Sequence, residues 1–191
     1  MYYATTCTSP LGTLTLASNG EQLLGLWLKE QKYHGCTLFE EMVQNDNLEV
    51  FKKTRLWLER YFDGQKPGPH ELPLAPPGSE FRQAVWKLLC QIPYGEVTTY
   101  GAIAHKIAAD RDKARLPGKA LGAGKARMSS QAVGGAVGHN PLSIIIPCHR
   151  VVGSNGSLTG YAGGLPLKIK LLKLEGVDVS QFFVPQKGTA L

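Results

Sequence analysis

The sequence predicts an α+β protein with two domains and a short C-terminal tail. Apolar and polar residues alternate over 13–18, and an apolar segment, 23–28, follows the turn-forming Ser-Asn-Gly, as in an antiparallel hairpin or meander. A stretch over 64–79 holds five prolines in sixteen residues, which favours a surface linker. Beyond it, apolar residues recur at helical spacing. We therefore expect an N-terminal domain over 1–76, a second domain over 77–178 and a tail over 179–191.

The first domain is expected to contain one helix after its strands. Leu48, Phe51, Leu58 and Phe62 recur at helical spacing, and Gly64 is placed to end the helix. The second domain opens with an amphipathic helix for which Ser79 is a suitable cap. Its expected buried face contains Phe81, Val85, Leu88, Leu89 and Ile92.

Two more helices follow the first helix of the second domain. One begins at Tyr100 after a threonine cap. A short one over 130–137 has a serine cap, consists of very small residues and ends before Asn140-Pro141. Small side chains let another molecule approach the backbone closely. The three helices together resemble a helix-turn-helix, although the polar connector over 109–128, which we expect to be an exposed loop, is far longer than usual.

The charge of the chain is unevenly distributed. Residues 1–76 hold 7 Lys/Arg and 9 Asp/Glu, whereas residues 77–191 hold 14 and 6. A basic second part suggests a polyanionic partner, and a lopsided solubility charge explains the same numbers equally well. No apolar run is long enough for a membrane span, and no secretory signal is visible. Four widely separated cysteines argue against a zinc ribbon or a disulfide scaffold. A reducing, cytoplasmic location without membrane contact is therefore expected.

A cysteine and a histidine interrupt an apolar run that otherwise suits a buried strand, SIIIPCHRVV over 143–152. Such breaks in local consistency concentrate at functional sites. His149 can activate the Cys148 thiol if Pro147 kinks the chain or a water bridges the two side chains. Glu175, in the last turn of an apolar helix, needs a partner and can orient the imidazole. Arg150 adds positive charge near the thiolate or meets a phosphate. From spacing alone, a catalytic and a buried structural Cys148 are both open.

Two segments, QAVGGAVGHNP over 131–141 and the stretch around Pro-Cys-His-Arg over 144–176, closely resemble the 6-O-alkylguanine–DNA alkyltransferases. The match runs in order from Glu80 to Gly176 and is looser over the first 76 residues. The resemblance implies a ribonuclease-H-like N-terminal domain and a winged-helix-type helix-turn-helix domain. It also implies DNA repair by a single, irreversible transfer of an alkyl group from the 6-oxygen of guanine to Cys148, without a cofactor or a metal.

The resemblance further implies a role for each site residue. Cys148 accepts the alkyl group, and His149 acts as a base through water, oriented by Glu175. Tyr100 donates a proton or a hydrogen bond to the departing guanine. Asn140 braces the turn between the recognition helix and the active site. Tyr161, the amide of Ala162 and Val137 border the guanine pocket. The implied DNA contacts, made by a monomer in the minor groove of double-stranded DNA after base flipping, are Gln131, Ala132, Gly134, Gly135 and Arg150.

Two departures from the family pattern concern DNA binding. Gln131 stands where the family usually has an arginine that fills the gap left by the flipped base. The connector also carries an inserted basic stretch, which either contacts phosphates or is a disordered excursion; its cations are Lys113, Arg115, Lys119, Lys125 and Arg127. The zinc site of some relatives is not expected, because Cys7 and Cys36 do not fall at matching places.

Two rival functions remain open at the level of sequence. A DNA-binding lesion sensor or regulator uses the same helix-turn-helix without transfer. A cysteine hydrolase built on Cys148, His149 and Glu175 turns over a small ester or amide, but gives the basic helix-turn-helix no role.

Overall fold

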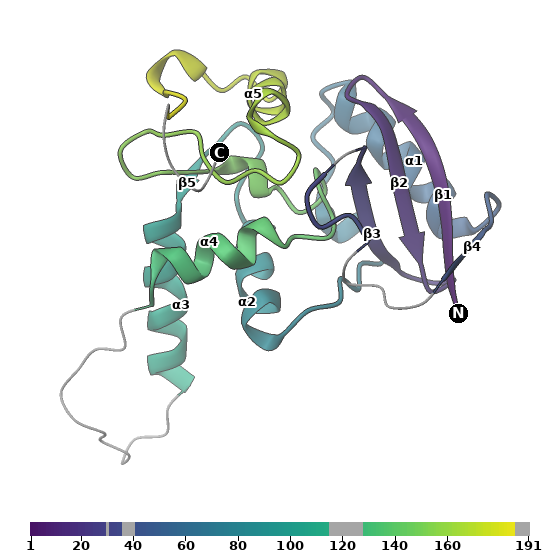
Figure 1. Ribbon diagram of the computed structural model, residues 1–191, viewed down its shortest axis with the longest axis horizontal. Coiled ribbons are helices and arrows are strands. Elements are labelled where there is room, and N and C mark those ends of the chain that lie inside the picture. Colours follow the sequence, from purple (N-terminus) through teal and green to yellow (C-terminus); the bar gives the residue numbers. More distant parts are fainter. Residues whose placement is uncertain (30, 36–40, 115–127, 186–191) are drawn as a thin grey trace.

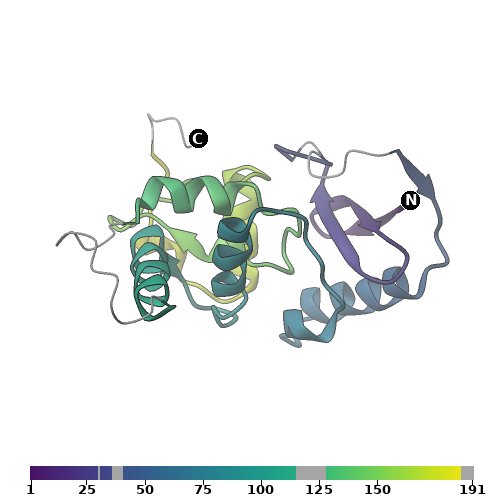
Figure 2. The ribbon, with the colours of Figure 1, turned by 90° about the horizontal axis from the view of Figure 1, so that it is seen from below.

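The computed structural model describes residues 1–29, 31–35, 41–114 and 128–185. A sheet and one helix form the N-terminal half, and the remaining helices form a second half beside it (Figures 1 and 2). The predicted α+β class is confirmed. One hydrophobic cluster runs through both halves, from Leu14 and Trp57 on one side to Val85 and Leu171 on the other. The two halves therefore share a core.

The sheet of the N-terminal half has the strand order β3-β2-β1-β4. Its first three strands form an antiparallel meander, so the predicted strands over 13–18 and 23–28 are confirmed, while β4 pairs in parallel with β1. The prediction did not include β4, which is only three residues long. The strands are β1 (Tyr2–Ser9), β2 (Gly12–Ser18), β3 (Leu23–Leu28) and β4 (Met42–Gln44).

Helix α1 (Glu49–Phe62) packs on one face of this sheet, as Figure 2 shows, and confirms the predicted helix of the first domain. It buries Phe51, Trp57 and Tyr61. Gly64 follows with φ of +75°, a conformation that glycine adopts without steric cost. A 3-10 turn, η1 (Pro69–Glu71), lies in the linker that then leads to the second half.

Segments from outside the sheet cover the free edge of β3. The linker contributes Leu74, which bridges to Leu23, and the segment before the cysteine contributes Leu142, which bridges to Leu26. Leu26 donates its amide hydrogen to Pro141 O and accepts one from Ser143 N. An unpaired edge strand exposes a row of backbone donors and acceptors. Here those groups attach the N-terminal sheet to the chain that leads into Cys148.

Three capped helices form the body of the second half: α2 (Glu80–Leu89), α3 (Tyr100–Ala114) and α4 (Ser130–Gly138). The predicted caps are observed: Ser79 and Thr99 accept hydrogen bonds from backbone amides of the first turn of α2 and of α3, and Ser129 does so for α4. Helix α4 lies across α2 and α3 (Figure 1).

The buried face of α2 differs from the predicted one. Val85 and Leu89 are buried as expected, but Phe81, Leu88 and Ile92 are only partly covered. The prediction omitted Trp86, which is 1% exposed and donates Nε1–H to Ala136 O of α4 at 2.9 Å. A buried indole needs such a partner for its N–H group.

The prediction of an exposed loop over 109–128 is wrong for the first six of these residues, because α3 continues to Ala114. Arg111 and Lys113 lie in the last turn, where the helix dipole favours cations, and the Arg111 guanidinium lies 5.5 Å from the centre of the Phe81 ring. The inserted cations Arg115, Lys119, Lys125 and Arg127 lie outside the described residues.

The C-terminal part completes the second half. Helix α5 (Leu165–Leu174) is followed by the 3-10 turn η3 (Val179–Gln181), and Phe183 of the tail bridges to Ser157. Strand β5 (Thr98–Thr99) pairs in parallel with β6 (Val151–Val152). The winged-helix assignment stays a prediction. Over the described ranges, no helix is long and apolar enough to cross a membrane.

Candidate active site

A tight turn, not the expected strand, presents Cys148. Ile144 adopts φ of +70°, Ile146 N donates to Leu142 O, and Cys148 begins the 3-10 turn η2 (Cys148–Arg150). The strand over 144–146 is therefore a wrong prediction, although all three isoleucines are buried. Pro147 has no amide hydrogen for a ladder, and a left-handed β-branched residue breaks the extended conformation. The kink expected at Pro147 is present.

Cys148 is 3% exposed and lies against the Asn140 side chain. Asn140 Nδ2 is 3.2 Å from Cys148 Sγ and also donates to Ile146 O at 2.8 Å, while Asn140 Oδ1 accepts from Leu142 N. Burial raises the pKa of the Cys148 thiol, whereas the Asn140 hydrogen bond and the charge of Lys168 lower it. Asn140 thus bonds the backbone of the turn at Leu142 and Ile146 and also donates to the sulfur.

The His149 imidazole is fully buried and bonds Glu175, with Nε2 at 2.8 Å from Oε1. A carboxylate only accepts hydrogen bonds, so Nε2 carries the proton, and neutral imidazole then keeps a lone pair on Nδ1. Nδ1 is buried and has no hydrogen-bond partner among the described residues. Burial lowers the pKa of His149 against the opposing effect of Glu175. The site therefore holds an imidazole poised to accept a proton at Nδ1.

Glu175 caps the C-terminus of α5. A carboxylate at this end of an apolar helix needs partners, and Glu175 has several. Arg150 binds it in a bidentate manner, at 2.8 Å from Nε to Oε2 and 2.9 Å from Nη2 to Oε1. Tyr61 and the amide of Gly95 also donate to it. Burial raises the pKa of Glu175, but the hydrogen bonds from His149 and Arg150 outweigh burial and lower it to about 2. Glu175 is ionised.

Arg150 has a buried ion-pair partner, Glu175, that neither expected role included. Its side chain is buried, and its third hydrogen bond goes to Ile92 O at 2.6 Å. These bonds hold Glu175, because a buried carboxylate requires a charged partner. The DNA contact that the resemblance implies for Arg150 stays a prediction.

Lys168 is a site residue that the sequence analysis missed. Its side chain is fully buried, and Nζ donates to Val151 O at 2.5 Å and to Thr159 O at 2.6 Å. Burial lowers the pKa of Lys168 to about 8, against the attraction of Cys148. The available signal was its spacing: Lys168 precedes the buried Leu171 and Leu172 by three and four residues and so shares their face of α5.

Tyr100 lies close to the same carbonyl as Lys168. It is the first residue of α3, and its hydroxyl donates to Thr159 O at 3.0 Å. Burial and the nearby Cys148 raise the pKa of Tyr100 to about 12. Tyr100 is therefore a neutral hydrogen-bond donor near the Cys148 thiol.

The remaining predicted residues fall into two groups. Tyr161 and Val137 are buried, and the Tyr161 ring stands perpendicular to His149 at 6.4 Å between ring centres. Ala162 lies in the following loop and accepts a hydrogen bond from Lys32 N. The second group lies on α4, where Gly134 is half-buried and the others are exposed, namely Gln131, Ala132 and Gly135.

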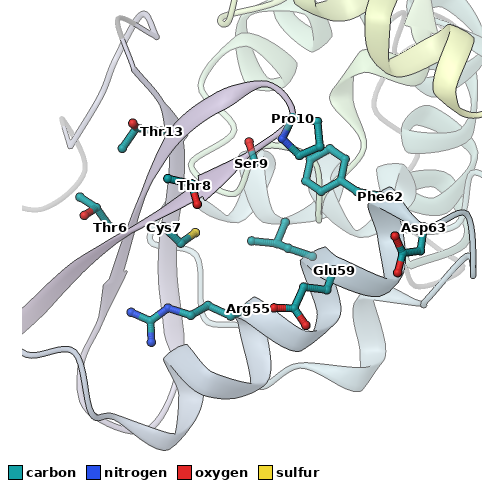
Figure 3. A pocket seen from close by; sticks show the side chains of 11 residues that line it. Thr6, Cys7, Thr8, Ser9, Pro10, Thr13, Arg55, Glu59, Phe62 and Asp63 are labelled. Atoms are coloured by element: carbon teal, nitrogen blue, oxygen red, sulfur yellow. The ribbon is translucent and has the colours of Figure 1, made fainter.

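A separate groove of about 850 Å³ lies between β1 and α1 (Figure 3). Cys7, Arg55 and Phe62 line it, and none of the predicted site residues does. Burial raises the pKa of the Cys7 thiol, so that thiol is less nucleophilic at neutral pH than a free one.

The fold and the site define a class: a two-domain protein in which a helical domain holds a buried thiol beside a histidine–carboxylate pair. Two family models match the chain, the ribonuclease-like domain of 6-O-methylguanine DNA methyltransferase over residues 1–76 and the DNA-binding domain of that enzyme over residues 80–177. The chain therefore belongs to the 6-O-methylguanine DNA methyltransferase family.

Individual relatives agree with this assignment. The methylated-DNA–protein-cysteine methyltransferase of Haemophilus influenzae is 41% identical over 92% of this chain and 87% of its own length. That of Methanosarcina acetivorans is 43% identical over 92% of this chain and 99% of its own. Among solved structures, the Mycobacterium tuberculosis OGT in complex with DNA is 38% identical, with a TM-score of 0.72 over 95% of this chain and 94% of the other.

Proposed function

We propose that the protein repairs DNA by transferring an alkyl group from the 6-oxygen of guanine to Cys148, once per molecule. The observation that carries this proposal is a pair of buried contacts at adjacent residues: Asn140 with the Cys148 sulfur, and His149 with Glu175. It supplies a nucleophile, a base and an orienting carboxylate, which is what thiol activation requires. The relatives named methylated-DNA–protein-cysteine methyltransferase support the substrate class.

The thiol proton passes to Nδ1 of His149, through a water molecule, because Nε2 already donates to Glu175. Asn140 then donates to the thiolate, and the Lys168 ammonium stabilises its charge. Both effects oppose burial, which favours the neutral thiol.

Transfer forms the bond between Cys148 Sγ and the alkyl carbon and breaks the bond from that carbon to the 6-oxygen. The electron pair stays on guanine. The Tyr100 hydroxyl turns from Thr159 O to donate a hydrogen bond to the departing guanine, and the proton held by His149 reaches the guanine through solvent. The product is a thioether, so each molecule reacts once. The thiolate is itself the nucleophile, so this reaction uses no cofactor or metal.

Helix α4 is the proposed DNA-docking element, inserted in the minor groove of the duplex. Gly134 and Gly135 each lower helix stability by up to about 1 kcal/mol relative to alanine. Packing within the protein does not require them: a Cβ at Gly135 meets nothing within 4 Å, and one at Gly134 meets the Tyr100 ring at 3.9 Å. A close approach by an outside molecule explains both glycines. Gln131 is exposed in the first turn, which supports its proposed contact with the opened base step.

Base flipping is part of the proposal because Cys148 is 3% exposed. A stacked base cannot reach a sulfur at that depth, so the guanine has to leave the duplex. Tyr161, Ala162 and Val137 then border the flipped base. The proposal includes a monomeric protein in a reducing cytoplasm, which keeps Cys148 a free thiol.

The test is the intact mass of the protein after mixing with a duplex that contains one 6-O-methylguanine, followed by peptide mapping. We expect one methyl group on the peptide that holds Cys148, saturating at one per molecule, and none on Cys148→Ala. DNA binding is expected to survive in that variant. An unmodified wild-type protein that still binds the duplex overturns the proposal in favour of a lesion sensor, and repeated turnover on a small ester favours a hydrolase.

A further inference from the structure

A residue of the N-terminal half reaches into the proposed alkyl-transfer site. Tyr61 lies in the last turn of α1 and is 1% exposed. Its hydroxyl donates to Glu175 Oε1 at 2.6 Å, although the two residues are 114 positions apart. Residues 1–76 match the ribonuclease-like domain and residues 80–177 the DNA-binding domain. This hydrogen bond therefore joins one domain to the proposed orienting carboxylate of the other.

Tyr61 shares its acceptor with the proposed base. Glu175 Oε1 accepts from Tyr61 at 2.6 Å, from His149 Nε2 at 2.8 Å and from Arg150 Nη2 at 2.9 Å. Glu175 Oε2 accepts from Arg150 Nε at 2.8 Å and from Gly95 N at 3.3 Å. A carboxylate oxygen offers about two lone-pair sites, so the three donors on Oε1 compete for its charge. Each added donor weakens the support that Glu175 gives to a protonated imidazole.

We propose that Tyr61 is a positioning residue of the alkyl-transfer site, which holds Glu175 in place for His149 and limits how strongly that carboxylate stabilises the imidazolium. The inference rests on the proposed function. Burial and the charge of Glu175 raise the pKa of Tyr61 well above its ordinary value, so its hydroxyl stays protonated and donates throughout the working pH range. The N-terminal domain thereby sets the proton affinity of a base in the other domain.

Other charged and titratable groups surround His149 and Glu175. A substitution at Tyr61 leaves these groups in the protein. Arg150 and Cys148 come from η2, Lys168 from α5, Tyr161 from the loop before α5, and Tyr94 from the segment after α2. Tyr94 is the useful member of this set. Its ring meets the Tyr61 ring edge-on at 5.8 Å, but its hydroxyl donates to Leu174 O, which is its one hydrogen-bond acceptor among the described residues.

Tyr61 also packs against Trp57 and Phe62, with ring centres at 5.5 and 5.3 Å, so a purely structural role has to be separated from the proposed one. Tyr61→Phe keeps the ring and removes only the hydroxyl. Tyr94→Phe is the matched control, because it removes a neighbouring phenol oxygen that has a backbone acceptor. Thermal unfolding of both variants verifies that they are folded.

The first readout is the apparent pKa of the pair formed by His149 and Cys148, followed by NMR titration of the His149 Cε1–H signal. Without the Tyr61 hydroxyl, Glu175 supports the imidazolium more strongly, so we expect this pKa to rise by about 0.5 to 1 unit in Tyr61→Phe. Tyr94→Phe keeps the wild-type value. Equal titration curves for all three proteins overturn the proposal.

The second readout is the single-turnover rate of methyl transfer as a function of pH. The base must be neutral to accept the thiol proton, so the acidic limb of the profile moves upward with the pKa in Tyr61→Phe and stays in place in Tyr94→Phe. A plateau lowered equally in both variants, with no shift of the limb, contradicts a positioning role and assigns Tyr61 to packing alone. A wild-type protein that transfers no methyl group refutes the proposed function instead, whereas the NMR titration still decides the role of Tyr61.

Discussion

The interior around Glu175 and the outer face of α4 are built in opposite ways. Around Glu175, five hydrogen bonds converge on one buried carboxylate. On α4, Gly135 leaves open space where any other residue has a side chain. The proposed proton transfer depends on groups held at fixed positions, whereas the proposed docking of α4 to DNA depends on space that side chains leave free. Substitutions in the first region should therefore cost stability or rate, and a substitution in the second should add stability and cost binding.

The largest expected effect comes from Glu175→Gln, which keeps the shape of the side chain and removes its charge. Arg150 then stays buried without a counter-ion, and breaking a buried ion pair costs about 3–5 kcal/mol of unfolding free energy. Denaturant unfolding at neutral pH measures this loss. The control is Glu49→Gln, whose exposed carboxylate lies 3.9 Å from Lys52 and should change stability by less than about 1 kcal/mol. Similar losses in both variants contradict the account of the interior.

The stability of Glu175→Gln relative to wild type should also depend on pH, in a direction that the pKa of Glu175 fixes. The pKa of Glu175 is lowered to about 2 in the fold, against about 4.3 in an unfolded chain. The unfolded chain binds more protons in this window, so the contribution of Glu175 is complete above about pH 4.5 and is lost as the pH falls toward 2. The stability gap between wild type and Glu175→Gln should close over that range. A gap that persists at pH 2 means that packing, not charge, accounts for the loss.

A smaller effect is expected at Lys168, whose ammonium lowers the pKa of Cys148. Lys168→Met keeps the apolar stem and removes the charge, so the thiolate fraction falls. We expect the rate of methyl transfer at neutral pH to drop about tenfold, which corresponds to about one pKa unit. Single-turnover kinetics with a methylated duplex measure the rate.

The pH dependence of that rate separates charge from structural damage. The pKa of Lys168 is lowered to about 8, so wild type loses this positive charge as the pH rises through 8. The rates of wild type and Lys168→Met should therefore converge in alkaline solution. A deficit that stays constant above pH 8 shows that the lost bonds to Val151 O and Thr159 O are the cause.

The sequence predicted the parts of the site that break a local pattern. Cys148 and His149 interrupt an apolar run, and Glu175 sits at the wrong end of a helix dipole, so each is visible from its neighbours in the chain. Tyr61 gives no such signal, because a tyrosine in an amphipathic helix is ordinary and its partner is 114 residues away. Lys168 was hidden for a related reason: a lysine in a helix with other exposed lysines suggests solvent contact.

For the fold, too, the features that were predicted are those that depend on neighbouring residues in the chain. The meander, α1 and the caps of α2, α3 and α4 depend on residues close together in the chain and were predicted. The turn at Ile144 was not, because a β-branched residue at φ of +70° contradicts its own preference and is held there by the surrounding core. The short strand β4 depends on pairing with β1, which composition does not reveal.

The smallest expected effect has two opposite signs in one variant, Gly135→Ala. Alanine stabilises a helix over glycine by up to about 1 kcal/mol, and the added Cβ meets nothing within 4 Å in the protein. The unfolding free energy should therefore rise. The same Cβ occupies the space proposed for the DNA backbone, so the affinity for a methylated duplex should fall about tenfold, which is about 1.4 kcal/mol. Thermal unfolding and fluorescence anisotropy measure the two quantities. Because the fold gains stability, a weaker complex cannot come from misfolding. Unchanged affinity removes this part of α4 from the docking surface, and a less stable protein means that Gly135 serves the fold and not the DNA.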